Sequence, residues 1–335
     1  MQTSADSLHR DAIVIDPVCP LLSIKEHLDL YKKGGLTAVA PTVGGWENAP
    51  ATMRTLGEWV RLIRERDDVL MVRRAVDIEE AKRAGKLGVI FHFQGADPLE
   101  NSVDLVDAYK AAGVGMIQLT YNVKNRVGDG CEERTDAGLS RFGLDVIARM
   151  NAAGIVVDCS HTGYRTTMDA FEASKAPTVF SHANPRAVYG TPRNITDEQI
   201  KAAAASGGLT GIVGFPAFVS ADKRPTLDQF IDHVAYVGDL VGIDHVALGI
   251  DYFQGQSPIM PDDRAVAMYE AVIASGRWST QSYPPPPYYY PQGIETPDRM
   301  PNLTAALLRR GFSPEDIRKV LGGNWMRVFR AVWGG

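Results

Sequence analysis

Residues 154–161 read GIVVDCSH and residues 176–182 read APTVFSH, so a short apolar run ends twice in the pair Ser-His. Both runs are continuously apolar, which is typical of parallel strands buried on both faces. Polar residues just beyond such strands point into the mouth of a parallel barrel. The two matched stretches therefore indicate a fold and the place of its chemistry together.

Six further runs of this kind are spread along the chain, and amphipathic stretches with helical spacing separate many of them. The runs are Ala12–Asp16, Leu36–Val43, Gly88–Gln94, Val114–Thr120, Gly208–Gly214 and His245–Asp251. The helical stretches include Val103–Ala112, Gly138–Ala153, Asp197–Ser206 and Leu227–Val241. Eight strands alternating with helices predict an α/β fold, a (β/α)8 TIM barrel of the metal-dependent hydrolase type. A doubly wound open sheet is the alternative, but no GxGxxG motif follows the first strand.

Length and composition fit one soluble domain. The chain has 335 residues, a net charge of −5 and three cysteines, Cys19, Cys131 and Cys159. The negative charge argues against nucleic acid or an anionic membrane as partner, and an odd cysteine count argues against a disulfide framework. The N-terminus lacks a signal-peptide pattern, and no apolar stretch is long enough to span a membrane. We therefore expect a cytoplasmic protein forming a single barrel over residues 1–335.

The C-terminal part adds a loop and helices to this barrel. The segment Ser282–Pro301, SYPPPPYYYPQGIETPDRMP, cannot be regular helix or strand, and it is either a solvent loop or a packed cover of one barrel end. Its density of tyrosines favours packing. Helices are expected over residues 313–333: Ser313 caps one, Gly322-Gly323 ends it, and Asn324–Trp333 forms the last.

Two histidines and an aspartate follow strands in matched positions. His161 and His182 each stand directly beyond a strand, and Asp251 follows the last predicted strand. Imidazoles from neighbouring strands can converge on one metal ion. The alternative for a single strand-end histidine is a hydrogen-bonded surface residue, but the matched pair favours a site.

The remaining candidates are weaker. Arg193, in the loop after the His182 strand, suits a substrate carboxylate held by two parallel hydrogen bonds, or else bonds loop carbonyls. His92 could be a core residue or a site residue. His9 and His233 are expected to be solvated on the terminus and a helix.

Several longer segments resemble the membrane (renal) dipeptidase family of zinc peptidases. They include LTYNVKNRVGDGCEE, GLSRFGLDVIARMNAAGIVVDCSH, SHANPRAVYGTPRNITDEQI and GIDHVALGID, and the similarity extends over nearly the whole chain. The resemblance implies a (β/α)8 barrel, often a homodimer, that binds two zinc ions and hydrolyses dipeptides. It also assigns roles: His161 and His182 as metal ligands, Asp251 beside the metal-bound water, and Arg193 on the substrate carboxylate.

The sequence departs from the family pattern at three places. Where the family has His-x-Asp after the first strand, residues 16–20 read DPVCP, with Cys19 as the one possible replacement ligand. The family's bridging glutamate is replaced by Gln94, and Tyr121 stands where the mammalian enzymes have a substrate-polarising histidine. Asn122 beside it lies in the pocket-facing loop and is a candidate substrate contact. Cys19 could be a zinc-binding thiolate or an inert buried thiol.

These departures predict an altered metal site. Two dications close together need anionic ligands, so one zinc ion is favoured over two, and an empty site is also compatible with the sequence. Three functions stay open: a mononuclear hydrolase of dipeptides or similar small carboxylated amides, a barrel enzyme with other chemistry on a carboxylated substrate, and a non-catalytic binding protein.

Overall fold

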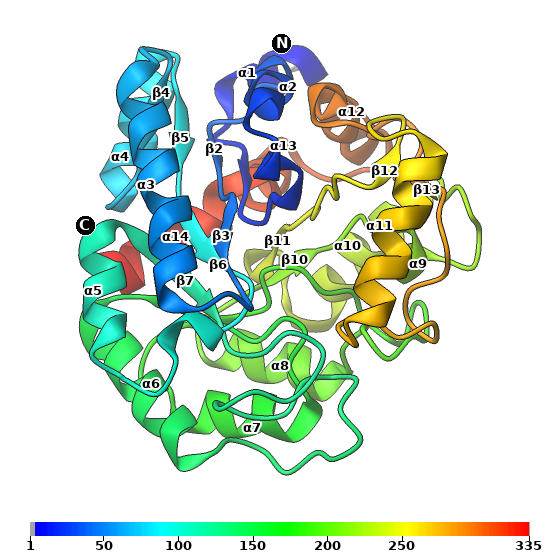
Figure 1. The fold of residues 1–335 in the computed structure, drawn as a ribbon. Helices are drawn as coiled ribbons and strands as arrows, with labels where there is room; N and C mark the ends of the chain where they lie inside the picture. The colour runs from blue at the N-terminus through cyan, green and yellow to red at the C-terminus, as the bar shows by residue number, and fades with distance from the viewer. Residues whose placement is uncertain (1–3, 335) are drawn as a thin grey trace.

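The eight predicted runs all form parallel strands in the structure, a computed structural model that describes residues 4–334 (Figure 1). Each run is buried on both sides, as expected for barrel strands enclosed by helices. In chain order the strands are β1 (Ile15–Asp16), β2 and β3 (Ala38–Val39, Thr42–Gly44), β5 and β6 (Leu87–Val89, Phe91–Phe93), β7 (Val114–Gln118), β8 (Val156–Asp158), β9 (Thr178–Val179), β10 (Thr210–Ile212) and β11 (Val246–Leu248).

Strand pairing follows the order of the chain. Pairing runs from β1 through β2 to β5, from β3 through β6, β7 and β8 to β9, and from β10 to β11. A parallel bridge between Phe180 and Thr210 joins β9 to β10. Between the last and first strands, the backbone N–H of Ile250 donates to the carboxylate of Asp16 at 3.1 Å. A further strand, β4 (Val69–Met71), pairs with β5 at the edge of the sheet. This strand was not predicted.

A ring of helices covers the strands. Helices α5 (Leu105–Ala112), α6 (Arg141–Ala153), α7 (Tyr164–Ala173), α8 (Asp197–Ala205) and α10 (Leu227–Val241) each pack against the next, and Figure 1 shows the first four curving along one side of the strands. The other helices are α1 (Ala5–Asp11), α2 (Leu28–Lys33), α3 (Ala49–Glu65), α4 (Ala75–Ala84), α9 (Pro216–Val219), α11 (Asp262–Ala274) and α12 (Pro301–Arg309).

The C-terminal segment departs from the prediction at its glycines. Ser313 caps α13 (Pro314–Arg318) as expected, but Gly322 and Gly323 do not end the helix. The chain continues through a π-helical turn, Lys319–Gly323, into α14 (Asn324–Trp333). A Cβ on Gly322 would lie 2.5 Å from the carbonyl oxygen of Ile13. The glycine is therefore required for close packing against the chain before β1, and it does not serve as a helix stop.

Helix α14 closes one end of the strands. Its apolar face joins a second core cluster that includes Ile15, Ile90, Met116 and Val156 from the strands. The indole N–H groups of Trp325 and Trp333 donate to the carbonyl oxygens of Leu248 and Gly115. Aromatic stacking continues along the helix from Trp325 through Phe329 to Trp333. The last helix is thus anchored both by packing and by hydrogen bonds to strands.

The Pro/Tyr-rich segment is packed against the protein. Tyr283, Tyr288 and Tyr290 are buried. The expectation that the segment contains no strand was wrong, because Tyr288–Tyr289 form a two-residue strand, β13, that pairs with β12 (Gln256–Ser257). Tyr290 packs against Tyr252, with ring centroids 5.0 Å apart. Within residues 4–334, no helix combines the length and the apolar character needed to cross a membrane.

Two histidines expected to be solvated are buried. His9 bonds Thr304 Oγ1 and the carbonyl oxygen of Gly34, and His233 bonds the carbonyl oxygen of Val219. Burial lowers the pKa of both imidazoles. The expectation was wrong because helix position alone does not show which neighbours a short helix packs against.

Candidate metal centre and substrate cavities

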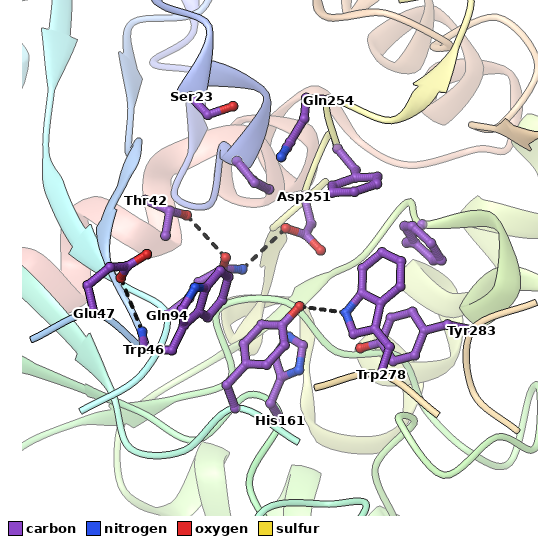
Figure 2. Close-up of a pocket in the computed structure, with 14 residues that line it drawn as sticks. Ser23, Thr42, Trp46, Glu47, Gln94, His161, Asp251, Gln254, Trp278 and Tyr283 are labelled. Carbon is purple, nitrogen blue, oxygen red and sulfur yellow. Dashed lines mark hydrogen bonds between the residues drawn. The ribbon is translucent and has the colours of Figure 1, made fainter. Parts of the chain in front are cut away.

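The two strand-end histidines meet in space. His161 follows β8 and His182 follows β9, and these strands are paired neighbours. Their Nε2 atoms lie 2.8 Å apart, and their ring centroids lie 4.8 Å apart. Asp251, beyond β11, lines the same cavity as His161 (Figure 2). The residues chosen from strand ends are thus brought to one place.

The orientation of His161 is fixed from its other nitrogen. His161 Nδ1 donates to Asn122 Oδ1 at 2.6 Å, while Asn122 Nδ2 donates to the carbonyl oxygen of Arg277. The ring of Tyr121 stacks on the imidazole with centroids 4.1 Å apart. Because Nδ1 carries the proton, Nε2 of the neutral ring presents a lone pair.

His182 is held in the same tautomer by a buried network. Asp158 accepts the backbone N–H groups of Ser160 and Ser181 on one oxygen and the Ser181 hydroxyl, at 2.5 Å, on the other. Burial alone would raise the pKa of Asp158, but contacts with His92, His182 and Ser181 lower it to about 2. Since the Ser181 proton is given to this carboxylate, the Ser181 oxygen accepts His182 Nδ1–H at 2.7 Å.

Two imidazole lone pairs therefore face each other at the centre of the site. Burial and the nearby Arg193 guanidinium lower the pKa of both His161 and His182 well below the usual value, so neither ring supplies a bridging proton. A cation bound to both Nε2 atoms satisfies this arrangement, and the second-sphere bonds to Nδ1 are those that metal-binding histidines commonly make. The residues present fit a metal ion on these two nitrogens.

The same residues do not build a larger ligand set. Within the described residues 4–334, no group of three His, Cys, Asp or Glu side chains could hold a metal ion. Cys19 is fully buried, its thiol contacts the carbonyl oxygen of Asp16, and burial raises its pKa well above the ordinary value. Gln94 lines the cavity, but its amide bonds Thr42 and Asp251. The arrangement fits one cation with coordination positions left for water or substrate.

Three residues of the site adopt a left-handed backbone. Asn122, His161 and Asp251 have φ angles of 59°, 61° and 59°, although none is glycine. Such a conformation costs a side-chain-bearing residue about 1 kcal/mol or more and persists where surrounding structure enforces it. The surrounding structure therefore holds an unfavourable backbone conformation at the three residues that shape this centre.

Asp251 is held at its turn by a tyrosine from the Pro/Tyr-rich loop. The Tyr290 hydroxyl accepts the backbone N–H of Phe253 at 3.0 Å and donates to the backbone carbonyl oxygen of Asp251. Gln94 Nε2 donates to Asp251 Oδ1 at 3.4 Å. Burial raises the pKa of the Asp251 carboxyl to about 8, against the lowering effect of Arg193. A carboxyl with this pKa can both accept and release a proton near neutrality.

Arg193 is a buried cation that forms no salt bridge within the described residues 4–334, although the Asp251 carboxyl lies near enough to raise its pKa. Its side chain is 2% exposed, and the guanidinium faces the Phe218 ring at 5.0 Å. Among the described residues, Arg193 Nε has no hydrogen-bond partner, and its Nη2 donates to the carbonyl oxygen of His182 at 3.4 Å. Burying a charged group without a partner is costly, so this position is suited to an incoming anion.

Two cavities meet at His161. The first, of about 180 Å³, is lined by 14 residues, among them Gln94, Asp251 and several aromatic side chains (Figure 2). The second, of about 430 Å³, has a mostly polar lining that includes Arg193 and Arg186. Of the residues that the structure describes, His161 is the one that lines both of these cavities.

The structure places some predicted residues differently from their expected roles. Asn122 is fully buried, lines neither cavity and bonds His161, Arg277 and Tyr283, so in this structure it orients the histidine. Cys19 is also buried and lines neither cavity. Tyr121, Gln94 and Asp251 line the first cavity, as expected.

Several functional side chains were missed. Asp158 was read as part of a strand, although a carboxylate two residues before Ser160-His161 is a detectable signal. Phe215 and Phe253, which line the first cavity, follow strands β10 and β11 closely, and applying the strand-end rule to apolar residues would have found them.

A parallel barrel whose strand ends present paired histidines is the arrangement of metal-dependent hydrolases. A model of the family described as membrane dipeptidase (peptidase family M19) matches residues 31–275 and 287–333. The chain belongs to the membrane dipeptidase family.

Its relatives agree with this placement. Dipeptidase tcpJ of Claviceps purpurea (strain 20.1) is 30% identical over 269 residues, and Dipeptidase verJ of Clonostachys rogersoniana is 29% identical over 290 residues. These matches cover 79% and 86% of this chain but only 56% and 66% of those longer proteins.

Among solved structures, an amidohydrolase from Pseudomonas aeruginosa is 37% identical, with a TM-score of 0.91, and the match covers 99% of this chain and 100% of that one. A metallopeptidase from Rhodobacter sphaeroides, liganded with a phosphinate mimic of L-Ala-D-Ala, shares the fold at 20% identity and a TM-score of 0.78, with 96% and 100% covered.

Proposed function

We propose that the protein is a metal-dependent dipeptidase that cleaves a dipeptide or a similar small carboxylated amide. The observation that carries the proposal is the pair of Nε2 lone pairs of His161 and His182, 2.8 Å apart. Both rings are fixed in this tautomer through Nδ1. A zinc ion held there would polarise the substrate carbonyl and lower the pKa of a bound water.

We assign the proton transfers to Asp251. Its carboxyl lines the cavity beside His161, and Gln94 orients it through the bond to Oδ1. In its ionised form Asp251 takes a proton from the attacking water and then delivers it to the leaving nitrogen. Its raised pKa suits both steps near neutral pH.

We assign the substrate carboxylate to Arg193. The guanidinium is buried in the wall of the second cavity, and its Nε is free to donate. A carboxylate there would pair with a guanidinium that otherwise forms no salt bridge in the described residues, while the scissile amide lies at His161. The preference for small carboxylated substrates follows from this placement.

The residues at the family's second-metal and bridging positions support a single cation at His161 and His182. The place of the family's second-metal ligands, residues 16–20, reads DPVCP. Its Asp16 carboxylate is buried and accepts the backbone N–H of Ile250, its Cys19 thiol is buried, and the bridging position holds the neutral Gln94 amide. With neither the family's His-x-Asp pair nor its bridging glutamate, a second dication would face the repulsion of the first with too little compensation.

The decisive experiment is metal analysis of the purified full chain after dialysis against zinc. We expect about one equivalent of zinc, lost in the His161→Ala/His182→Ala double variant, and dipeptide hydrolysis that a chelator abolishes and zinc restores. Two equivalents would contradict the single-cation assignment. A zinc-loaded protein that cleaves no dipeptide in a broad panel would favour other chemistry on the same scaffold, and no zinc at saturation would favour a binding protein.

A further inference from the structure

The first cavity has an aromatic wall that the proposed chemistry does not explain. Six of its 14 lining residues are aromatic: Trp46, Tyr121, Phe215, Phe253, Trp278 and Tyr283. They come from segments far apart in sequence, after β3, β7, β10 and β11 and from the chain between α11 and β13. Figure 2 shows Trp278 and Tyr283 on the side of the cavity opposite Thr42 and Gln94.

This wall is fixed by contacts among its own members. Trp278 stacks on Tyr283 with centroids 4.2 Å apart and planes inclined by 4°, and its indole N–H donates to the Tyr121 hydroxyl at 2.9 Å. Asn122 Nδ2 donates to the Tyr283 hydroxyl at 3.1 Å. Phe215 packs against Trp278 and Tyr283. With these polar atoms already bonded, the wall offers chiefly apolar ring surface.

The size of the cavity fits one large side chain. A cavity of about 150 Å³ lined by apolar groups is enough to hold a benzene ring, and this one measures about 180 Å³. Two carboxyl groups, those of Glu47 and Asp251, line the cavity beside the aromatic wall. An α-ammonium group next to an aromatic side chain is complementary to that combination.

The two cavities set the direction of the substrate. Arg193 lines the second cavity and not the first, whereas Glu47 and Asp251 line the first and not the second. With the C-terminal carboxylate on Arg193 and the scissile amide at His161, the N-terminal residue lies in the aromatic cavity.

We propose that the aromatic cavity is the specificity pocket for the N-terminal residue, and that it selects dipeptides whose first side chain is a large aromatic or aliphatic group. The inference rests on the proposed dipeptidase function and adds to it the substrate class. The described residues that line the second cavity include no comparable cluster of aromatic side chains, so we expect no such selection of the C-terminal residue.

The first test compares kcat/KM for Phe-Gly, Gly-Phe and Gly-Gly with the zinc-loaded enzyme. A side chain transferred into an apolar pocket changes specificity by about tenfold or more, so Phe-Gly is expected to exceed Gly-Gly by at least that factor, and Gly-Phe to exceed it by much less. Equal values for Phe-Gly and Gly-Gly, or a preference for Gly-Phe, would overturn the inference.

Variants of the lining residues test whether the preference for Phe-Gly arises in the aromatic cavity. Trp278→Ala and, as a milder change, Phe253→Leu should lower the Phe-Gly to Gly-Gly ratio, whereas Tyr289→Ala should leave it unchanged. Tyr289 is on the same loop as Tyr283, but it stacks on Arg224 and does not line the cavity. An unchanged ratio in folded Trp278→Ala and Phe253→Leu proteins, checked by circular dichroism, would overturn the assignment of the pocket.

Binding without turnover separates this inference from the proposed function. With chelator present, calorimetric titration of Phe-Gly, Gly-Phe and Gly-Gly should reproduce the same order of affinity. Preferential binding of Phe-Gly without hydrolysis at saturating zinc would overturn the proposed dipeptidase and leave the pocket standing. Hydrolysis of all three dipeptides at similar kcat/KM would support the proposed dipeptidase and overturn the specificity pocket.

Discussion

Asp158 is the residue on which the orientation of His182 depends. It lies below the histidine pair and accepts two backbone N–H groups and the Ser181 hydroxyl. Replacing it by asparagine removes the ionised acceptor, so the Ser181 proton can turn toward His182 Nδ1. The imidazole would then carry its proton on Nε2, where it blocks a metal.

We therefore expect Asp158→Asn to weaken zinc binding about 10- to 100-fold, as loss of second-sphere partners commonly does. Competition with a chromophoric chelator measures this change. Asp244→Asn is the matched control, because Asp244 is an exposed partner of Lys319. Unchanged zinc affinity in a folded Asp158→Asn protein would refute the hydrogen-bond network described for His182.

Arg193→Met tests the carboxylate site. Methionine keeps apolar contact with Phe218 but removes the charge, so KM for a dipeptide should rise by about 10- to 100-fold with a smaller change in kcat. The matched control is Arg224→Met, since Arg224 also stacks on an aromatic ring, at 3.9 Å from Tyr289.

A dipeptide with an amidated C-terminus supplies the second control for Arg193. The wild-type enzyme should bind it poorly, and the variant should bind it about as well as the wild type does. An Arg193→Met protein that still prefers the free carboxylate would rule out this role.

At the scale of single residues, the sequence predicts positions better than roles. His161, His182 and Asp251 could be found because each directly follows an apolar run. The role of Asn122 could not, since its amide acts through His161 and Tyr283, which are distant in sequence. For the same reason Cys19 could be either a ligand or an inert thiol until its burial was known.

The π-helical turn before α14 gives a prediction at the scale of elements. Gly322→Ala would place a Cβ 2.5 Å from the carbonyl oxygen of Ile13, and backbone cannot move aside cheaply. We expect a loss of about 1–3 kcal/mol in the free energy of unfolding, measured by urea denaturation.

Gly57→Ala is the matched control for this variant. Gly57 lies within α3, and a Cβ there would meet nothing within 4 Å. Because alanine favours helix over glycine, the free energy of unfolding should rise by about 0.5–1 kcal/mol. A Gly322→Ala protein as stable as the wild type would contradict the packing explanation for this glycine.

The Pro/Tyr-rich loop supports the Asp251 turn through one hydroxyl. Tyr290→Phe leaves the buried N–H of Phe253 and the Asp251 carbonyl oxygen without their shared partner. We expect the free energy of unfolding to fall by about 1–3 kcal/mol and kcat to fall with it. Tyr289→Phe should change neither, since Tyr289 is half-buried beside Arg224 and phenylalanine keeps the ring that stacks there. A normal kcat in Tyr290→Phe would show that Asp251 keeps its position without the loop.

At the scale of elements, continuous apolar runs sufficed to predict all eight barrel strands, and the cap at Ser313 was correctly predicted. The π-helical turn was missed because a glycine pair has two physical meanings, a helix stop or a close approach. Only the position of Ile13 in space distinguishes them.

For the whole molecule, buried histidines make stability depend on pH. Burial lowers the pKa of His9 and His233 below the usual 6.5, so the unfolded chain binds more protons than the folded one as the pH falls through that value. Stability contributed by the neutral rings is present above pH 6.5 and is lost on acidification. The contribution of His9 and His233 to the free energy of unfolding should therefore fall from pH 7.5 to pH 5.5.

The His9→Gln/His233→Gln variant should show a shallower fall over this range, even if it is less stable at pH 7.5. Urea denaturation at both pH values measures the two slopes. Parallel slopes for variant and wild type would assign the acid sensitivity to other groups.

The position of α14 has a consequence for synthesis. One end of the barrel is closed by residues 324–333, which complete a core cluster built on strands near the start of the chain, such as Ile15 and Ile90. A nascent chain on the ribosome holds those strands without their cover until this segment has emerged. Final closure must therefore follow translation of α14, and until then the apolar residues of this cluster lack their cover.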